Sequence, residues 1–184
     1  MDLYTAEILS KAELFKGLST QEILRLFRDI PVNPKNHGKG SILAFRGDDY
    51  SRLLFLIKGK VSAEIDDASG KTLRVETIEA PAPLAAGILF AEEAALPVTI
   101  LAATEVTTIT LSKKNLLETL QKNEALLNNF LEDVGNKIVF LADKMALFRF
   151  KTLRQKVCGY LLSLEDRQKN QSIRLPYTKE VLSE

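Results

Sequence analysis

Few residues of this chain can carry out metal, redox or nucleophilic chemistry. Its 184 residues include one histidine, His37, one cysteine, Cys158, and two methionines. A metal-dependent enzyme on a small β-barrel needs two or three histidines with a carboxylate, and a hydrolase needs a base beside its nucleophile. Neither set can be assembled around His37, and no glycine-rich phosphate loop follows an expected strand. We therefore predict that the protein is not an enzyme.

The single cysteine narrows the redox chemistry further. One thiol cannot form a disulfide within the chain, nor hold an iron–sulfur cluster or a multi-thiolate zinc site. For Cys158 itself, a small buried side chain is a better interpretation than a redox thiol. His37 lies in the stretch NPKNHGKG, which is typical of a solvent-exposed turn.

A heptad repeat dominates the second half of the chain. Apolar residues follow one another at alternating steps of four and three, like the a and d positions of a two-helix coiled coil. A helix lying on a globular core shows a wider stripe, so this seam predicts a homodimer. An intramolecular core helix that matches by chance is the alternative. The seam consists of Leu127, Leu131, Val134, Ile138, Leu141, Met145 and Phe148.

A second apolar stripe lies beside the seam and is expected to face the chain's own body. It consists of Leu126, Phe130, Phe140 and Leu147.

The charge of the chain is unevenly distributed. Its formal net charge is +1, whereas residues 144–184 carry 9 Lys and Arg against 4 Asp and Glu. A basic end favours an anionic partner, DNA first, although solvated surface alone gives the same pattern. The sequence contains no apolar run of about 18 residues and no signal-peptide pattern. We expect a soluble, cytoplasmic protein without a membrane partner.

Hydrophobic periodicity predicts an α+β fold. Residues 5–14 and 20–29 have the pattern of short helices, the second opened by a capping box from Ser19 to Glu22. Short runs of period two, separated by glycine and aspartate turns, predict strands and a small antiparallel barrel or jelly roll. These runs are 41–45, 53–57, 60–65, 72–78, 97–102 and 106–111.

Helices and a basic end follow the expected strands. Ser112 caps a helix to about 121, Asn123 opens the long helix to Phe148, and 152–164 form a further helix. A polar turn, EDRQKNQS, a short strand, IRLP, and a capped helix start at Thr178 come last. The expected domains are a sensor at 1–122, a dimerisation helix at 123–150, and the start of a DNA-binding domain at 151–184.

The order of these elements and several local strings resemble the CRP/FNR superfamily of bacterial transcription regulators. LFKGLS (14–19), Gly40, Gly47-Asp48 and FLIKGKVSAEI (55–65) are similar to the front of its cyclic-nucleotide-binding-type β-roll. The long helix, TLRQKVCGYLLSL and RLPYTKEVLSE are similar to the hinge and the entry of its winged helix-turn-helix. The resemblance covers about residues 10–184.

The resemblance implies a DNA-binding regulator of which this chain is the sensor and dimerisation part. Thr178 to Leu182 match the start of the first helix of the DNA-reading unit, whereas the turn, recognition helix and wing have no counterpart. Promoter DNA is therefore expected to bind through a C-terminal domain outside this chain. A natural regulator-like protein without a reader is the alternative.

The resemblance also places the effector pocket. Members that bind cyclic nucleotides use a Gly-Glu pair and an Arg-Ser pair, and Ala85-Ala86 and Leu96-Pro97 occupy these positions here. Without the arginine, a buried phosphate would lack its counter-charge, and Pro97 also lacks a backbone donor. We predict that cyclic AMP does not bind.

Apolar residues take the place of the missing charges. The expected pocket walls are Leu84, Leu89, Leu96 and Val98 of the roll, with Leu141 and Met145 of the long helix. Such a pocket suits a flat apolar ligand such as haem, or it is a filled core. The stretch PLAAGILFAEEAALPVTI resembles the nitric-oxide-responsive branch, including regulators of the hybrid cluster protein, and some members of that branch bind haem.

Haem sensing of nitric oxide or redox stress is thus the first functional hypothesis. Met145 is the stronger candidate axial ligand and His37 the weaker one, although packing in the seam also accounts for Met145. The alternative is a ligand-free or partner-controlled dimeric module whose pocket is filled by side chains.

Overall fold

The structure is a computed structural model that describes residues 1–66, 71–148 and 152–168. It divides into two compact units, Met1–Gly135 and a second that begins at Asn136. The border falls inside the long helix, within the segment expected from sequence to be one dimerisation element. The first unit contains all the strands of the described chain.

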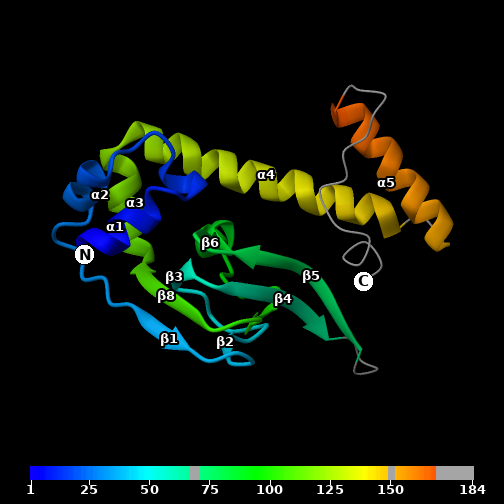
Figure 1. Ribbon diagram of the computed structural model, residues 1–184, viewed down its shortest axis with the longest axis horizontal. Helices are drawn as coiled ribbons and strands as arrows, with labels where there is room; N and C mark the ends of the chain where they lie inside the picture. The colour runs from blue at the N-terminus through cyan, green and yellow to red at the C-terminus, as the bar shows by residue number, and fades with distance from the viewer. Residues whose placement is uncertain (67–70, 149–151, 169–184) are drawn as a thin grey trace. The chain divides into compact units, whose positions relative to one another are not determined.

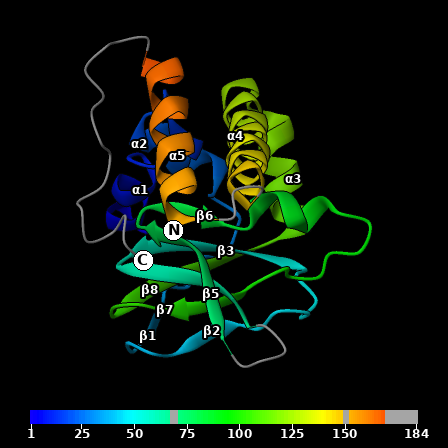
Figure 2. The ribbon, with the colours of Figure 1, turned by 90° about the vertical axis from the view of Figure 1, so that its right-hand side faces the viewer.

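The first unit is a β-roll of two four-stranded antiparallel sheets (Figures 1 and 2). This confirms the α+β, cyclic-nucleotide-binding-type roll expected from the sequence. Helices α1 (Leu3–Leu9), α2 (Thr20–Leu26) and α3 (Lys113–Lys122) gather on one side of the roll, and α1 and α3 contact β3. One sheet has the order β1 (Lys35–His37), β8 (Val106–Ser112), β3 (Arg52–Lys58), β6 (Ala82–Leu84), and the other has β2 (Ile42–Ala44), β7 (Thr99–Ala102), β4 (Lys60–Asp66), β5 (Thr72–Glu79).

The core forms where the strands are most apolar. Leu53, Phe55 and Leu56 of the central strand β3 are nearly inaccessible to solvent, as the apolar run SRLLFLI indicates. The turn from β3 to β4 requires glycine. Gly59 has φ +88°, and a Cβ on it would lie 2.2 Å from the carbonyl oxygen of Glu105.

The N-terminal helices are shorter than the sequence predicts. Residues 5–14 were expected to form one helix, but α1 (Leu3–Leu9), capped by Asp2, ends at Leu9, and a separate 3₁₀ turn, η1 (Glu13–Phe15), follows. The second helix, α2 (Thr20–Leu26), begins at the predicted capping box: Ser19 accepts from the Glu22 amide and Glu22 accepts from the Ser19 amide. That prediction is confirmed, although the helix ends three residues early.

The sequence analysis did not predict strands β1 and β6 or the 3₁₀ turn η2 (Ala86–Phe90). Strand β1 pairs with β8 and contains His37, so the prediction of an exposed loop there is wrong. Strand β6 pairs with β3 at a sheet edge, where Pro83 is tolerated. Both strands are three residues long and lack alternation, so only their long-range pairing defines them.

The helices after the roll agree with prediction. Ser112 caps α3 (Lys113–Lys122), and Asn123, in extended conformation, ends it and accepts a hydrogen bond from the Leu126 amide at the start of α4 (Glu124–Phe148). Helix α5 (Leu153–Gln168) runs four residues past the predicted end, into the expected polar turn. The predicted strand IRLP and the helix start at Thr178 lie outside the described residues. No helix within the described ranges is long and apolar enough to span a membrane.

The first turns of α4 are anchored to the roll. Leu126 and Phe130 are buried, and the Phe130 ring meets Phe90 edge-on at 5.4 Å between centroids. The Asn129 side-chain amide donates to the carbonyl oxygens of Leu14 and Lys16, at 3.1 and 2.8 Å. The inward stripe predicted from the sequence is thus confirmed at Leu126 and Phe130.

Farther along α4 the inward stripe is less enclosed. Phe140 is half-buried, and the ammonium groups of Lys137 and Lys144 each lie 5.2 Å from its ring centroid. Leu147 belongs to the helix, but its side chain lies outside the described part.

Candidate effector site and dimerisation face

A left-handed residue opens the segment predicted to bind an effector. Strand β6 ends at Leu84, Ala85 follows with φ 50° and ψ 37°, and the 3₁₀ turn η2 (Ala86–Phe90) begins. Ala85 is the only non-glycine residue with positive φ in the described chain. The Cβ of an L-residue crowds the following carbonyl in this conformation, at a cost of about 1–2 kcal/mol.

Tyr50 holds the strained segment in place. Its hydroxyl donates to the carbonyl of Leu84, directly before Ala85, and accepts from the Leu54 amide at 3.0 Å. The side chain is buried, and this burial raises the pKa of Tyr50 to about 12, although the hydrogen bond from Leu54 opposes the shift. Sequence reasoning did not identify Tyr50.

We expect Ala85→Gly to raise the free energy of unfolding by about 0.5–1 kcal/mol. Relief of the left-handed strain, about 1–2 kcal/mol, exceeds the entropy that glycine adds to the unfolded chain, about 0.4–1 kcal/mol. Urea unfolding followed by circular dichroism measures the change. Ala86→Gly is the matched control, because Ala86 is buried with ordinary backbone angles and its replacement should destabilise. Destabilisation by both substitutions would contradict the assignment of strain.

The second half of the predicted effector segment is joined to the β2–β3 connection by backbone hydrogen bonds. The Gly47 amide donates to the Leu96 carbonyl at 2.8 Å, and the Leu96 amide donates to the Asp48 carbonyl at 3.0 Å. The Tyr50 amide donates to the Ala94 carbonyl at 2.6 Å. The Leu96 amide is therefore already engaged, and Pro97 has no amide hydrogen to offer an anion.

The predicted pocket residues of the roll lie together in the core. Leu84 and Leu89 are 0% exposed, Leu96 is 2% exposed, and Ala86 is also buried. Ala85 and Val98 are partly buried against the same cluster, whereas Pro97 is exposed. The sequence thus identified residues that share one apolar region, and their side chains fill it.

The predicted pocket residues of the long helix are not enclosed. Leu141 is 44% exposed and Met145 is 71% exposed. These values agree with an outward seam on α4.

His37 lies on β1, the edge strand opposite β6 in the same sheet. Its Nε2 lies 3.1 Å from the hydroxyl of Thr108 on β8, and desolvation together with Lys35 lowers the pKa of His37. Strands β8 and β3 lie between β1 and β6. At ordinary strand spacing, the distance from β1 to β6 across the sheet is therefore about 14 Å. His37 therefore cannot ligate a group held against Leu84 and Leu89.

These residues do not fit a haem. A haem pocket needs apolar space and an axial ligand, but the roll's apolar residues pack against one another and His37 is remote. Over the described ranges, no group of three or more His, Cys, Asp or Glu side chains could hold a metal ion. Cys158 is exposed, so its predicted burial is wrong.

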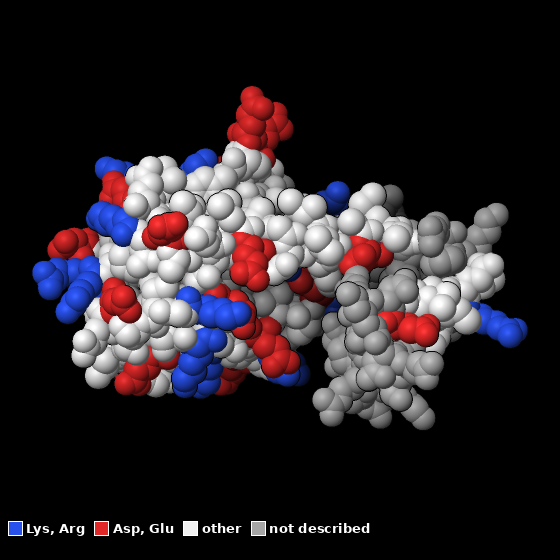
Figure 3. All heavy atoms as spheres, turned by 90° about the horizontal axis from the view of Figure 1, so that it is seen from above, with Lys and Arg blue, Asp and Glu red and all other residues white. Residues whose placement is uncertain are grey.

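The predicted seam contains the most exposed apolar side chains of α4. Leu131, Ile138 and Met145, one heptad apart, are 58%, 64% and 71% exposed, and Val139, outside the seam, is 58% exposed. Val134 differs, because it packs against the core beside Gly87. Figure 3, drawn from the side on which α4 lies in Figure 1, shows uncharged surface interspersed with charges of both signs. The side chain of Phe148 lies outside the described residues.

Comparisons with known proteins agree on the fold of the first unit. Residues 34–123 match the family model "cyclic nucleotide-binding domain". A transcriptional regulator from Thermotoga maritima is 25% identical, with a TM-score of 0.61, over 70% of this chain and 95% of that chain. No curated protein sequence matches the chain.

Two further solved structures share the fold at lower identity. The sensor domain of the transcriptional regulator DNR from Pseudomonas aeruginosa is 20% identical, with a TM-score of 0.61, over 80% of this chain and 93% of that one. The catabolite activator protein of Thermus thermophilus is 16% identical, with a TM-score of 0.65, over 84% of this chain and 71% of that one. Residues 34–123 thus match the cyclic nucleotide-binding domain model, and the chain shares its fold with the sensor regions of these transcriptional regulators.

Proposed function

We propose that the chain is the sensor and dimerisation region of a DNA-binding transcription regulator, and that two copies pair along α4. The observation that carries this proposal is the row of exposed apolar residues at heptad spacing, Leu131, Ile138 and Met145. Exposed apolar side chains in such a row are stabilised when a second helix covers them. A second copy of the chain packed along α4 would bury them. Promoter DNA would bind through a domain that follows the described residues.

The proposed sensor does not use a cyclic nucleotide. Ala86 and Leu96, at the positions where the family resemblance places the charged groups of cyclic-nucleotide binders, are buried in the core. A phosphate at this position would meet apolar side chains and an engaged Leu96 amide, and leucine stands where the resemblance places the arginine. Its desolvation would cost several kcal/mol without compensation.

Calorimetric titration with cyclic AMP should give no saturable heat. The missing counter-charge and the filled core both oppose binding, so the prediction does not depend on one residue. The double variant Leu96→Arg/Pro97→Ser supplies a charged fork and a backbone donor but leaves the filled core, so it should also give no saturable heat; its folding is checked by circular dichroism. Saturable binding of cyclic AMP to the unaltered chain at micromolar concentration would contradict the prediction.

Of the two effector hypotheses, the side-chain-filled, partner-controlled module has the geometric support. Leu84, Leu89 and Leu96 occupy the space that an apolar ligand would need. Haem-based sensing of nitric oxide rests on the sequence resemblance alone and stays a prediction. The absorption spectrum after mixing with ferrous haem decides between them: the filled module leaves the spectrum of free haem, whereas a Soret band that shifts with nitric oxide would overturn it.

A further inference from the structure

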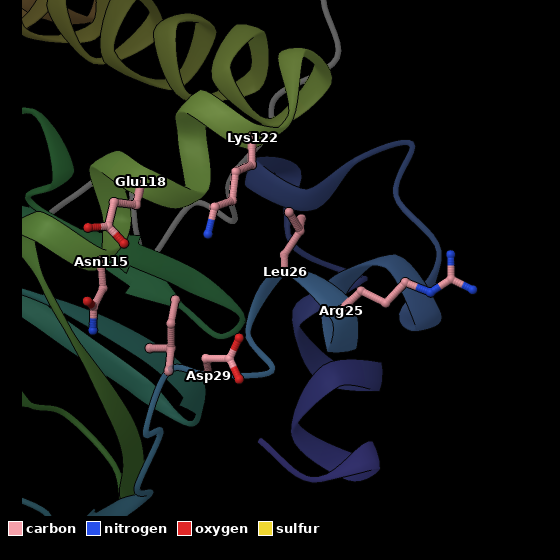
Figure 4. A pocket seen from close by; sticks show the side chains of 7 residues that line it. Arg25, Leu26, Asp29, Asn115, Glu118 and Lys122 are labelled. Carbon is pink, nitrogen blue, oxygen red and sulfur yellow. The ribbon is translucent and has the colours of Figure 1, made fainter.

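The pocket between α2 and α3 does not gather its charged groups around one ligand. Exposed charged side chains line it, and Figure 4 shows the carboxylates of Asp29 and Glu118 pointing away from one another and from Lys122. We assign this pocket no ligand. The surface of interest is instead the part of α4 that lies beside the 3₁₀ turn η2.

Two glycines adjoin the seam residue Val134, and the single chain requires neither of them. Gly87 lies on η2 and Gly135 follows Val134 on α4, and both glycines are exposed and lack a positive φ. A Cβ on Gly87 would meet only the methyl groups of Val134, at 3.5 and 3.6 Å, which is ordinary contact. A Cβ on Gly135 would meet no atom within 4 Å. Neither backbone conformation nor crowding within the chain therefore explains these glycines.

Gly135 also weakens the helix that contains it. In a helix interior, glycine is less favourable than alanine by about fivefold in the equilibrium for helix formation. Within the described chain no close contact at Gly135 offsets this loss. A contact that forms only when a second chain is present would account for it.

The turn η2 meets α4 through two side chains of the helix. Val134 packs beside Gly87, and the Phe130 ring meets Phe90, the last residue of η2, edge-on at 5.4 Å. Figures 1 and 2 show η2, the green turn after β6, beneath α4. All four residues belong to the first unit. The predicted effector segment thus adjoins the heptad seam.

Heptad geometry determines what a second helix would place there. The step of three from Leu131 to Val134 assigns these residues to positions a and d, so Gly135 is at e and Phe130 is at g. In a parallel pair, a d side chain inserts among four residues of the other helix, one of them at e, and each e position faces a g position. The partner's Gly135 would therefore lie against Val134 and Phe130, the two residues that contact η2.

We propose that η2 is part of the dimer interface, and that the partner's α4 approaches it closely at Gly135. This inference rests on the proposed pairing along α4. Two-fold symmetry makes the contact twice, with Gly87 of each chain beside Gly135 of the other, and the missing Cβ atoms let the two backbones approach. The occupant is a second copy of the chain, because the seam that passes through Val134 continues onto this surface. The filled effector segment would thereby stabilise the dimer directly.

The test measures the dimer dissociation constant of the whole chain by sedimentation over a concentration series. Gly87→Arg should weaken dimerisation at least about tenfold, because its side chain would take the space of the partner helix and bury a charge there. The single chain has room for it, since Gly87 is exposed and its Cβ would be in ordinary contact. Gly38→Arg is the matched control. Gly38 is also exposed without a positive φ, but it lies between β1 and β2, so dimer affinity should be unchanged.

A second variant separates folding from pairing. Gly135→Gln should increase the helical circular dichroism signal, because glutamine favours helices more than glycine does, and yet weaken dimerisation at least about tenfold. Unchanged dimer affinity of Gly87→Arg, while Ile138→Asp gives monomers, would overturn the η2 contact and leave pairing along α4 intact. Equal weakening by Gly38→Arg would also overturn it. An unaltered chain that is monomeric at micromolar concentration would overturn both the η2 contact and the pairing.

Discussion

Replacing Ile138 with aspartate is expected to convert the proposed α4 dimer into monomers. Ile138 is 64% exposed and stands in the middle of the heptad seam of α4. In a parallel helix pair it meets its own symmetry mate, so the substitution brings two carboxylates together in an apolar interface. Burial of an unpaired charge costs several kcal/mol per ion, which weakens dimerisation by at least about 10³-fold. Sedimentation velocity at micromolar concentration measures the result.

The neighbouring residue supplies the control for this experiment. Val139 is 58% exposed, close to the value for Ile138, but it lies about 100° around the helix and outside the seam. Val139→Asp should therefore remain dimeric under the same conditions. If the Ile138 variant stayed dimeric, or if both variants dissociated equally, pairing along this seam would be ruled out.

Removal of the Tyr50 hydroxyl should lower the free energy of unfolding by about 1–3 kcal/mol. In Tyr50→Phe, the Leu84 carbonyl loses its donor and the Leu54 amide loses its acceptor, at a site where Tyr50 is 3% and Leu84 0% exposed to solvent. Urea unfolding near neutral pH measures the loss. Tyr4→Phe is the matched control, because Tyr4 is 69% exposed and its replacement should leave stability unchanged. Equal stability of the Tyr50 variant and the unaltered chain would contradict this role.

The raised pKa of Tyr50 predicts that the free energy of unfolding falls at alkaline pH. Below pH 10, the ordinary pKa of tyrosine, Tyr50 is protonated in the folded and unfolded chains alike, and its contribution is complete. Between pH 10 and about 12 the unfolded chain releases a proton that the folded chain keeps, so stability falls as pH rises. The expected loss is about 2–3 kcal/mol. Tyr50→Phe should lack this part of the pH dependence.

Elements with a strong local pattern were predicted well. Helix α4 occupies the residues expected from its heptad because 25 residues of regular pattern outweigh local exceptions such as Gly135. Ser19 with Glu22, and Ser112, define helix starts through side-chain chemistry that is visible in the sequence. The larger strands follow from alternation in the same way.

The elements that were missed depend on contacts between distant parts of the chain. His37 was assigned to a loop because its surroundings are polar, and it joins a sheet through pairing with Val106, far along the chain. Cys158 was predicted to be buried, but it lies on α5 and is exposed to solvent. Short segments carry too little periodicity to reveal such placements.

The sequence identifies which residues replace the charged groups of the candidate effector site, but not the contacts that hold the site together. The replacement of charged groups at Ala86 and Leu96 is readable from the sequence once the family resemblance is recognised. The support of Ala85 by Tyr50 is not, because these residues lie 35 positions apart and meet only through the pairing of β3 with β6.

Disulfide cross-linking at Ile138 tests pairing along α4 most directly. In the background Cys158→Ser, Ile138→Cys places one thiol at a seam position of each copy, within the Cα separation of about 7 Å that a disulfide spans. Mild oxidation should give a covalent dimer of Ile138→Cys, whereas Val139→Cys in the same background should stay monomeric on a denaturing gel. Cross-linking of Val139→Cys alone, or of neither variant at a concentration where the chain sediments as a dimer, would contradict the proposed α4 interface.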